Sequence, residues 1–490
     1  MKPIIRKVSL LLCLSMLLGL MLTAIGCGKA DATGDQTTTS GTEQTTAPVG
    51  DSDTATTTTA PEVDPYEPAE ENFGDANGDP TDFTIAVRAN RYGYLFDDGT
   101  SAERVNAAAY QRNAMIEERY NIKIGIVEIE STADKWNTSL LTSDGAYDLA
   151  CFDYWWGIEQ NGLLYDLMSL PEIDVTDPHW YPGWNDNVTI NNKLFSIAGD
   201  ATLEILENIE ILFFNKSIAE AYKLDLYKEV TDGKWTIDRM KEINVLVSEN
   251  LDNNTEEDDV YGALYDVHSV PTQLYAAGLQ LSQIQSDGSI AIATDKERIV
   301  AVTEAVASLI NDGGVRYDSN TARATANKGM SIFTNGNALF YATALYLGKT
   351  LRASETSFDY GVLVPPKFDE ASEYITSCYG ASLFGIPLSV KDAHRAAVIL
   401  DAINYYSNDT VVEAFYEIVL KYQVADSEED ANMIQMARDT LYVEFAFIQS
   451  LSAYGSVKNA AIQDTPIASA LAATLKVSQK ELLNFTAAYQ

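Results

Sequence analysis

Hydrophobic and polar residues follow patterns that predict a strand, a helix and a second strand at the start of the folded chain. FTIAVRA from Phe83 has the two-residue alternation of a strand, and NIKIGIVEIE from Asn121 repeats it. Between them, Thr100 and Glu103 have the spacing of a helix capping box, before an apolar stripe at helical spacing. The stripe consists of Val105, Ala108, Ala109, Met115, Ile116 and Tyr120. This order predicts a parallel strand pair with a right-handed crossover.

The third predicted strand lies in YDLACFDYWWGIEQNGLLYDL, residues 147–167, and ends in a group of aromatic residues. Residues 148–152 are an apolar run, and Asp153-Tyr154-Trp155-Trp156 follows it. Strand ends in α/β sheets carry ligand-contacting side chains, and these four can stack on and hydrogen-bond to a sugar-like ligand. Aromatic residues also anchor cores and interfaces, so both interpretations stay open. The three strands predict a doubly wound α/β lobe.

The N-terminus has the pattern of a secretory leader. Lys2, Arg6 and Lys7 precede an unbroken apolar run and then Cys27. Residues 24–27, AIGC, resemble the lipobox of bacterial lipoproteins, in which the cysteine is diacylated, although leucine is commoner than alanine at the first place. The alternative is an uncleaved anchor, since a run of this length can span a bilayer. The lipobox is favoured, and it predicts a signal peptide over residues 1–26 and a body held at the extracellular face of the membrane, as in Gram-positive lipoproteins.

Residues 27–80 are rich in Thr, Ser, Asp, Glu, Pro and Gly, with almost nothing to bury, and they predict a disordered tether. Asp75 opens a stretch like a calcium loop, but Ala86 stands where such a loop needs Glu, so a turn is expected. The remaining chain is too long for one core and predicts two lobes. The formal net charge of the whole sequence, −38, argues against nucleic acid or anionic lipid as partners.

Seven short motifs then follow in a particular order. They are Lys193-Leu194-Phe195, Phe214-Asn215-Lys216, Gly233-Lys234-Trp235-Thr236, Val260-Tyr261-Gly262, FTNGNALF from Phe333, YGVLVPP from Tyr360, and Gly385-Ile386-Pro387-Leu388-Ser389. Each motif alone is unspecific. As an ordered set over residues 81 to about 450, they resemble the extracellular solute-binding proteins of bacterial carbohydrate ABC transporters, the family that includes maltose-binding protein.

The resemblance implies an α/β, two-lobed periplasmic-binding-protein-like fold with a hinge and an interlobe cleft. The N-terminal lobe would comprise residues 81–196 with 374–425, and the C-terminal lobe 199–366 with 426–490. A small solute would bind in the cleft and pass to the permease subunits of an ABC importer, and the resemblance favours an oligosaccharide as that solute. Hinge closure would trap the ligand.

Candidate ligand-binding residues are taken from the strand ends and loops that would face this cleft. They are Tyr92, Tyr94, Asp153, Tyr154, Trp155, Trp156, Trp184, Asp200, Tyr341, Tyr346 and Tyr379. For each, a place in the core or on the surface is the competing interpretation. Trp235 is expected to pack at a helix start. In the implied fold Cys151 and Cys378 lie on or beside neighbouring strands, so they form either a disulfide or two buried free thiols.

Catalytic and cofactor motifs have little support. The histidines His179, His268 and His394 are scattered, without the spacing of a zinc site. GASLFG from Gly380 is not a GxSxG elbow, and no glycine-rich phosphate loop occurs. We therefore expect a non-enzymatic binding protein without cofactor or metal. A surface-anchored glycan-degrading enzyme, an inert adhesin or scaffold, and a binding protein for peptides or other small solutes are the alternatives.

Overall fold

The structure is a computed structural model that describes residues 64–251, 259–319, 328–354, 356–418 and 427–490. The predicted signal peptide, the lipidation site at Cys27 and the tether up to residue 63 lie outside these residues. So does the lobe boundary predicted near residue 425. In the described ranges no helix has both the length and the apolar character needed to cross a membrane.

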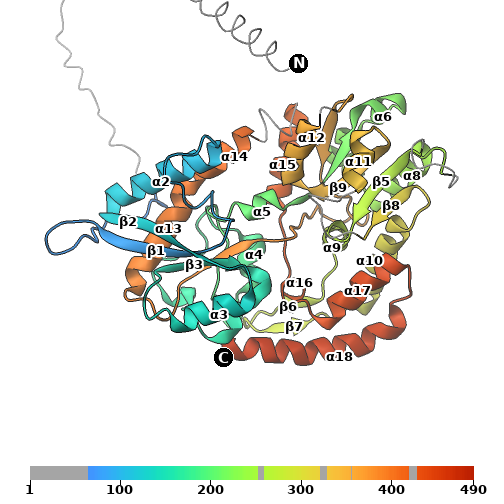
Figure 1. Cartoon of the computed structure of the whole chain (residues 1–490). Helices are drawn as coiled ribbons and strands as arrows, with labels where there is room; N and C mark the ends of the chain where they lie inside the picture. Colours follow the sequence, from blue (N-terminus) through green and yellow to red (C-terminus); the bar gives the residue numbers. More distant parts are fainter. Residues whose placement is uncertain (1–63, 252–258, 320–327, 355, 419–426) are drawn as a thin grey trace, which may run out of the picture. The chain divides into compact units, whose positions relative to one another are not determined.

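The first sheet confirms the predicted strand–helix–strand unit. Its strand order is β11-β3-β1-β2, with β1 parallel to β2 and β3, and β11 antiparallel to β3. The strands are β1 (Thr81–Arg88), β2 (Ile122–Ile129), β3 (Leu149–Asp153) and β11 (Ser382–Gly385). Helices α2 (Arg104–Tyr120) and α3 (Ala133–Thr142) make the crossovers (Figure 1). The predicted capping box is wrong, because the Glu103 side chain makes no cap hydrogen bond and the Thr100 hydroxyl bonds to Asp98 instead.

The second sheet is mixed and has the strand order β10-β4-β9-β5-β8. Its strands are β4 (Glu210–Asn215), β5 (Tyr261–Asp266), β8 (Val315–Asp318), β9 (Ala338–Ala344) and β10 (Tyr360–Leu363). β5 runs parallel to β8 and β9, whereas β4 is antiparallel to both β9 and β10. The carboxyl ends of β5 and β9 therefore share an edge with the amino end of β4.

Helices surround the second sheet, and α6 (Lys216–Ala221) begins at the last residue of Phe214-Asn215-Lys216, whereas α8 (Ile237–Val247) begins directly after Gly233-Lys234-Trp235-Thr236. The other helices include α7 (Leu226–Thr231), α9 (Ser269–Ala276), α10 (Lys296–Ile310), α11 (Lys328–Thr334) and α12 (Gly348–Ala353). Thr236 caps α8 by accepting the backbone N–H of Arg239. Trp235 is fully buried and donates its indole N–H to the carbonyl of Val364, 2.9 Å away, which confirms its expected packing role.

Three backbone segments connect the sheets and lie side by side. Ile209 pairs with Cys378 in an antiparallel bridge, and Thr376 pairs with Leu441 in a parallel one. After β11 the chain continues through α13 (Ala393–Ser407), which packs on α2, and later enters α15 (Glu428–Asp439), which packs on β10. The lobe boundaries predicted from the sequence fall in or near these segments and stay predictions.

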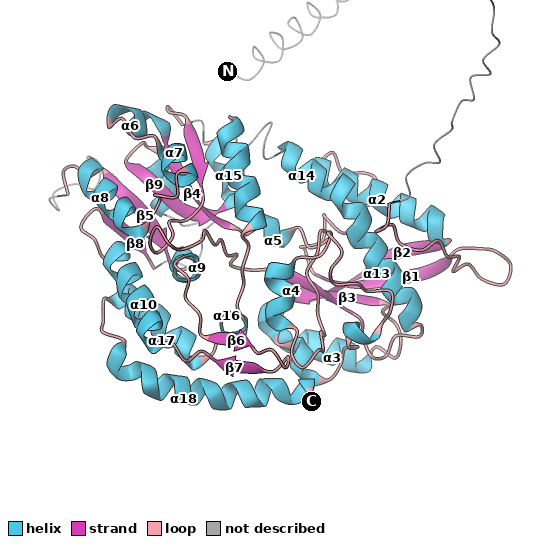
Figure 2. Cartoon of the chain, turned by 180° about the vertical axis from the view of Figure 1, so that it is seen from behind, coloured by secondary structure: helices cyan, strands magenta, loops and turns pink. Residues whose placement is uncertain are grey.

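The C-terminal helices are not confined to the second sheet. They are α16 (Phe445–Ile448), α17 (Ser452–Gln463) and α18 (Ala468–Phe485), and α18 packs on the hairpin of β6 (Ser282–Ile284) and β7 (Ile290–Ile292). In Figure 2, α18 runs from below α10 and α17 to the end of the chain near α3. At the end of the chain the ring of Tyr489 lies 4.8 Å from that of Phe195, and Lys193 donates to the carbonyl of Gln490. The C-terminus thus packs on the segment that leads into the first crossing.

Residues 64–80 make defined contacts, although their composition predicts a tether. The Tyr405 hydroxyl donates to Asp64, Arg119 pairs with Glu67 at 2.8 Å, and Phe73 stacks on Tyr120. Composition does not reveal these contacts, because they are made by a few residues among many small polar ones. The expected turn at Asp75 is confirmed by its side chain accepting backbone N–H groups two and four residues on.

Gly183 provides a test of the packing between α4 (Pro182–Val188) and a connecting segment. A Cβ atom at Gly183 would lie 1.8 Å from the carbonyl oxygen of Leu441, a backbone atom that cannot turn away. We expect Gly183→Ala to lower the free energy of unfolding by about 1–3 kcal/mol. In the control Gly455→Ala, on α17, the added methyl meets nothing within 4 Å and should raise it by about 0.5–1 kcal/mol. Urea unfolding measures both, and a Gly183→Ala protein as stable as wild type would contradict the contact.

Glu444 predicts a pH dependence of stability. Its buried carboxylate accepts the backbone N–H groups of Leu281 and Ser282, and burial raises its pKa from 4.5 to about 7. The folded state then holds a proton more tightly than the unfolded chain, so stability should fall as the pH rises from about 4.5 to about 7. At 1.36 kcal/mol per pKa unit, this loss is up to about 3 kcal/mol.

The variant Glu444→Gln keeps an oxygen acceptor but cannot ionise. Urea unfolding at pH 5 and pH 8 should therefore show a smaller difference for the variant than for the wild type. Equal differences in the two proteins would mean that Glu444 does not titrate between these pH values.

Candidate functional site

The carboxyl ends of β1 and β3 meet at the point where the first sheet changes its direction of winding. β1 connects to β2 on one side and has β3 as its other neighbour, which is the arrangement that creates a ligand site outside the strand ends in open α/β sheets. Arg88 ends β1, and Asp153 ends β3. Ser382, the first residue of the antiparallel β11, is paired directly with Asp153.

Arg88 holds a buried group of charged and polar side chains at this edge. Its guanidinium lies 3.2 Å from Asp153 and 3.1 Å from Glu204, which belongs to α5 (Glu204–Glu207) in the first crossing. The Ser382 hydroxyl donates to Glu204 at 2.6 Å. Burial raises the pKa of Asp153, and the positive charge of Arg88 opposes that rise. The exposed Arg91 adds a weaker contact, 3.6 Å from Glu204.

The three residues after β3 point in different directions because they form a 3₁₀ helix, η1 (Tyr154–Trp156). Asp153 starts this helix by accepting the backbone N–H of Trp155 at 3.1 Å. Tyr154 is buried, whereas Trp155 and Trp156 are partly exposed. The Trp156 ring lies 5.5 Å from the guanidinium carbon of Arg88. One indole therefore extends the charged group, and the other is free to join a different set of residues.

That set is an aromatic cluster, defined here as Trp155, His268, Tyr379, Phe447 and Tyr454. Ring centroids are separated by 5.7 Å for Trp155 and Tyr379, 5.3 Å for Trp155 and Phe447, and 4.4 Å for His268 and Tyr379. Trp155 comes from the end of β3, whereas His268 follows the end of β5 in the second sheet. Trp155, His268 and Tyr379 are each partly exposed. The cluster therefore places accessible ring surface where strand ends of both sheets come together.

Five of the predicted ligand-binding residues are buried in the core. They are Tyr94, Tyr154, Trp184, Asp200 and Tyr341, with exposed fractions of 7%, 1%, 0%, 0% and 1%. Tyr154 and Trp184 pack edge to face, with ring centroids 5.1 Å apart. The core interpretation that the sequence left open describes these residues, because a fully covered side chain offers no surface to a ligand.

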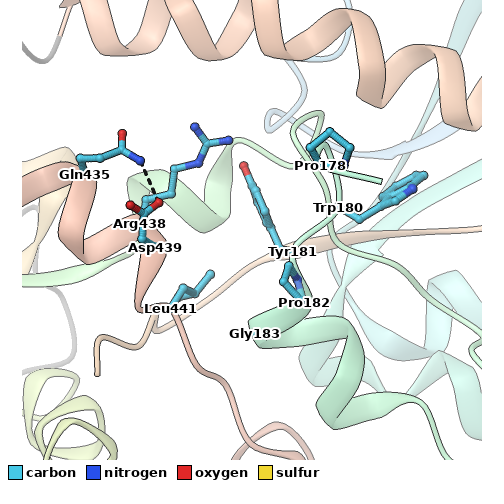
Figure 3. Close-up of a pocket in the computed structure, with 9 residues that line it drawn as sticks. All are labelled: Pro178, Trp180, Tyr181, Pro182, Gly183, Gln435, Arg438, Asp439 and Leu441. Carbon is cyan, nitrogen blue, oxygen red and sulfur yellow. Dashed lines mark hydrogen bonds between the residues drawn. The ribbon is translucent and has the colours of Figure 1, made fainter. Parts of the chain in front are cut away.

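The Asp200 carboxylate is enclosed by hydrogen-bond partners and an ion pair, so it is not open to a ligand. Its carboxylate accepts from the Tyr181 hydroxyl at 2.8 Å and from Asn408 at 2.7 Å, and it pairs with Arg438 of α15 at 2.9 Å. Figure 3 shows Tyr181 and Arg438 facing the same pocket, which has a volume of about 320 Å³. Asp200 thus joins the first crossing to the residue that directly follows α13 and to α15.

The remaining predicted residues are partly exposed. Tyr92 lies in the loop after β1 and donates its hydroxyl to Glu128 at 3.1 Å. Tyr346 lies on the 3₁₀ helix η4 (Leu345–Leu347) directly after β9, and this helix contacts α5. On α5, burial raises the pKa of Glu207 to about 7.

Sequence reasoning missed Arg88, Glu204, His268 and Phe447. A charged residue at the end of an apolar strand was a signal for Arg88, since strand ends carry site residues. Glu204, His268 and Phe447 have no local signal, because only the tertiary fold brings them to the site. Cys151 and Cys378 are free thiols, and both are buried, so the two-thiol alternative describes the structure.

Comparisons with solved structures identify the fold. No family model and no curated protein matches the sequence. The structure is similar to a cyclo/maltodextrin-binding protein complexed with maltotetraose, with a TM-score of 0.56 and 14% identity over 83% of this chain and 99% of that one. It is also similar to the cyclic α-maltosyl-1,6-maltose binding protein from Arthrobacter globiformis, with a TM-score of 0.53 and 18% identity over 83% and 100% of the two chains.

A third similar structure is an ABC substrate-binding protein from Listeria monocytogenes in complex with cycloalternan. Its TM-score is 0.51 and its identity 13%, over 82% of this chain and 99% of that chain. The chain therefore has the two-lobed fold of periplasmic-binding-protein-like ABC substrate-binding proteins, and the predicted fold class is confirmed.

Proposed function

We propose that the protein is an extracellular solute-binding protein that captures an oligosaccharide between its two sheets and delivers it to an ABC importer. The observation that carries the proposal is the aromatic cluster, with accessible rings beside a charged group at strand ends of both sheets. The fold supports the same function, since the similar structures include proteins that hold maltotetraose and cycloalternan.

The chemistry of the site suits a sugar. Sugar rings have apolar faces that stack on aromatic side chains, and Trp155 and Tyr379 offer such surfaces. Hydroxyl groups of a sugar both donate and accept hydrogen bonds, so they match the partly exposed Asp153 carboxylate and the exposed Arg91 guanidinium at the rim of the charged group. Closure about the connecting segments would cover the ligand and change the surface that a permease meets.

The cell-surface part of the proposal rests on the sequence alone. A leader ending at residue 26 and acylation of Cys27 would hold the protein at the outer face of the membrane, beside its permease. In this role the protein binds its ligand without chemical change, so no turnover of bound glycans is expected.

Isothermal titration calorimetry with maltose, maltotetraose and a cyclic maltodextrin tests the proposal. We expect heat with a one-to-one stoichiometry for at least one of these glycans, and a parallel assay should detect no new reducing ends. Release of reducing ends that is lost on replacing a single carboxylate would favour the glycan-degrading enzyme. The absence of binding across a wide panel of glycans would contradict the oligosaccharide proposal, and binding of peptides alone would redirect it to another solute class.

A further inference from the structure

Asp177, His179 and Asp401 place three potential metal ligands together, and none of them belongs to the aromatic cluster. One ligand atom from each residue lies within 4.8 Å of the other two. Asp177 and His179 belong to the loop before α4, and Asp401 lies on α13. The imidazole of His179 is held against the ring of Trp180, with centroids 4.8 Å apart, and its Nε2 lies 2.8 Å from Asp401.

Asp177 and Asp401 have fewer hydrogen-bond and ion-pair partners than the acidic residues around them. Among the described residues, the Asp177 carboxylate makes no hydrogen bond or ion pair. The side chain of Asp401, a residue that is only 6% exposed, has His179 as its one hydrogen-bond partner in the same part of the chain. Burial raises the pKa of Asp177, nearby His179 lowers it, and the negative charges of Asp174 and Asp401 raise it again. In the same described ranges the second ring nitrogen of His179, Nδ1, is buried without a hydrogen-bond partner. Two carboxylates and one imidazole thus lie close enough together to bind a single ion.

A pocket of about 200 Å³ opens onto both aspartates. Its other acidic lining residues are Glu67, Glu71 and Glu172. Each of these three has a basic partner, since Arg119 pairs with Glu67 and His394 pairs with both Glu71 and Glu172. The two glutamates raise the pKa of His394 to about 9, so it is protonated at neutral pH. Among the acidic residues that line this pocket, Asp177 and Asp401 have His179 as their basic neighbour, in place of the arginine or protonated histidine that the three glutamates have.

We propose that Asp177, His179 and Asp401 bind a divalent transition-metal ion, with Zn²⁺ as the best match. Imidazole nitrogen with carboxylate oxygens is a ligand set that zinc accepts, whereas Ca²⁺ and Mg²⁺ prefer oxygen ligands alone. Three protein ligands leave a fourth position for a water molecule, and the pocket gives it room. The spacing of histidines in the sequence does not reveal this site, because a single histidine takes part and Asp401 is 222 residues away from it.

The ion would join two segments that are far apart in the sequence. The ligands connect the loop before α4 to α13, and residues 65–71 form another wall of the same pocket. Binding should therefore stabilise the folded state by linkage, because the three ligands are not held together in an unfolded chain. The metal proposal and the sugar proposal rest on different residues, so either one can be contradicted without affecting the other.

The test uses the mature chain without a histidine tag, stripped of metal by a chelator and then exchanged into metal-free buffer. Calorimetric titration with ZnCl₂ should show one binding site per chain, and Zn²⁺ should raise the Tm. Asp177→Asn should weaken binding at least about tenfold, as loss of a ligand does. The charge-matched control Asp186→Asn, a carboxylate on α4 outside the ligand set, should bind Zn²⁺ as the wild type does.

A second variant, Asp401→Asn, keeps the result interpretable if Asp177→Asn is unstable. Circular dichroism confirms folding of each variant before titration. Failure of the wild type to bind one Zn²⁺ per chain would overturn the proposal, and so would equal affinity in Asp177→Asn, Asp401→Asn and Asp186→Asn. Competition by excess MgCl₂ as effective as by CoCl₂ would also overturn it, because it would indicate general attraction to acidic groups.

Discussion

Replacing Trp155 by alanine should weaken oligosaccharide binding by about 30-fold or more while the protein stays folded. Central aromatic residues of a binding site commonly cost about 2 kcal/mol or more when truncated, which corresponds to about 30-fold in Kd. Trp155 is the partly exposed ring that joins Tyr379 and Phe447 in the aromatic cluster. Trp155→Ala combined with Trp156→Ala should abolish binding, because the second indole lies beside Arg88.

Two controls separate ligand contact from packing. Trp155→Phe keeps an aromatic face and should retain much of the affinity. Trp184→Ala removes a fully buried indole and should lower the free energy of unfolding by about 3–5 kcal/mol. Calorimetric titration and urea unfolding measure the two effects. If Trp155→Ala lowers stability as much as Trp184→Ala does and leaves the affinity of the folded fraction unchanged, Trp155 is a core residue.

Replacing Arg88 by methionine should lower the free energy of unfolding by about 3–5 kcal/mol at pH 7. Arg88 is 9% exposed and neutralises the buried Glu204 and the partly exposed Asp153, and its removal leaves charge uncompensated in a poorly solvated place. Methionine keeps most of the length and apolar stem of arginine. The loss is therefore electrostatic more than steric.

Lowering the pH should reduce this deficit. Burial raises the pKa of Asp153 and Arg88 opposes the rise, so without Arg88 the folded protein holds a proton on Asp153 more tightly than the unfolded chain does. The stability of the variant relative to wild type then rises as the pH falls from 7 toward 5. Arg91→Met is the control, because Arg91 is 60% exposed and should cost less than about 1 kcal/mol. A pH-independent deficit would indicate that lost packing, and not unpaired charge, destabilises the variant.

Local patterns in the sequence were sufficient for the first sheet and for many helices. Alternation around Phe83 and Asn121 corresponds to β1 and β2, which pair in parallel over their full length. The cap of α2 failed, because Thr100 had a nearer partner in Asp98 than the helix backbone. No local pattern places Ser382 beside Asp153, since that pairing joins strands more than two hundred residues apart, and only the family resemblance made the two strands neighbours.

The site was predictable in part. Trp155 follows a strand end, and the position of that strand in the sheet makes its neighbourhood a site. Composition could not show that Tyr154 turns inward, because the tight 3₁₀ turn decides the direction of each side chain. Asp200 follows a crossing segment as expected, but Tyr181, Asn408 and Arg438 surround its carboxylate. Phe447 lies in the C-terminal helices, which the sequence motifs do not reach.

A crystal structure with a glycan that binds in calorimetry tests the central claim most directly. The proposal predicts ligand density against Trp155 and Tyr379, with sugar hydroxyls hydrogen-bonded to Asp153 or Arg91 at the accessible rim of the charged group. Density at another surface, with the rings of the aromatic cluster covered only by protein, would contradict it.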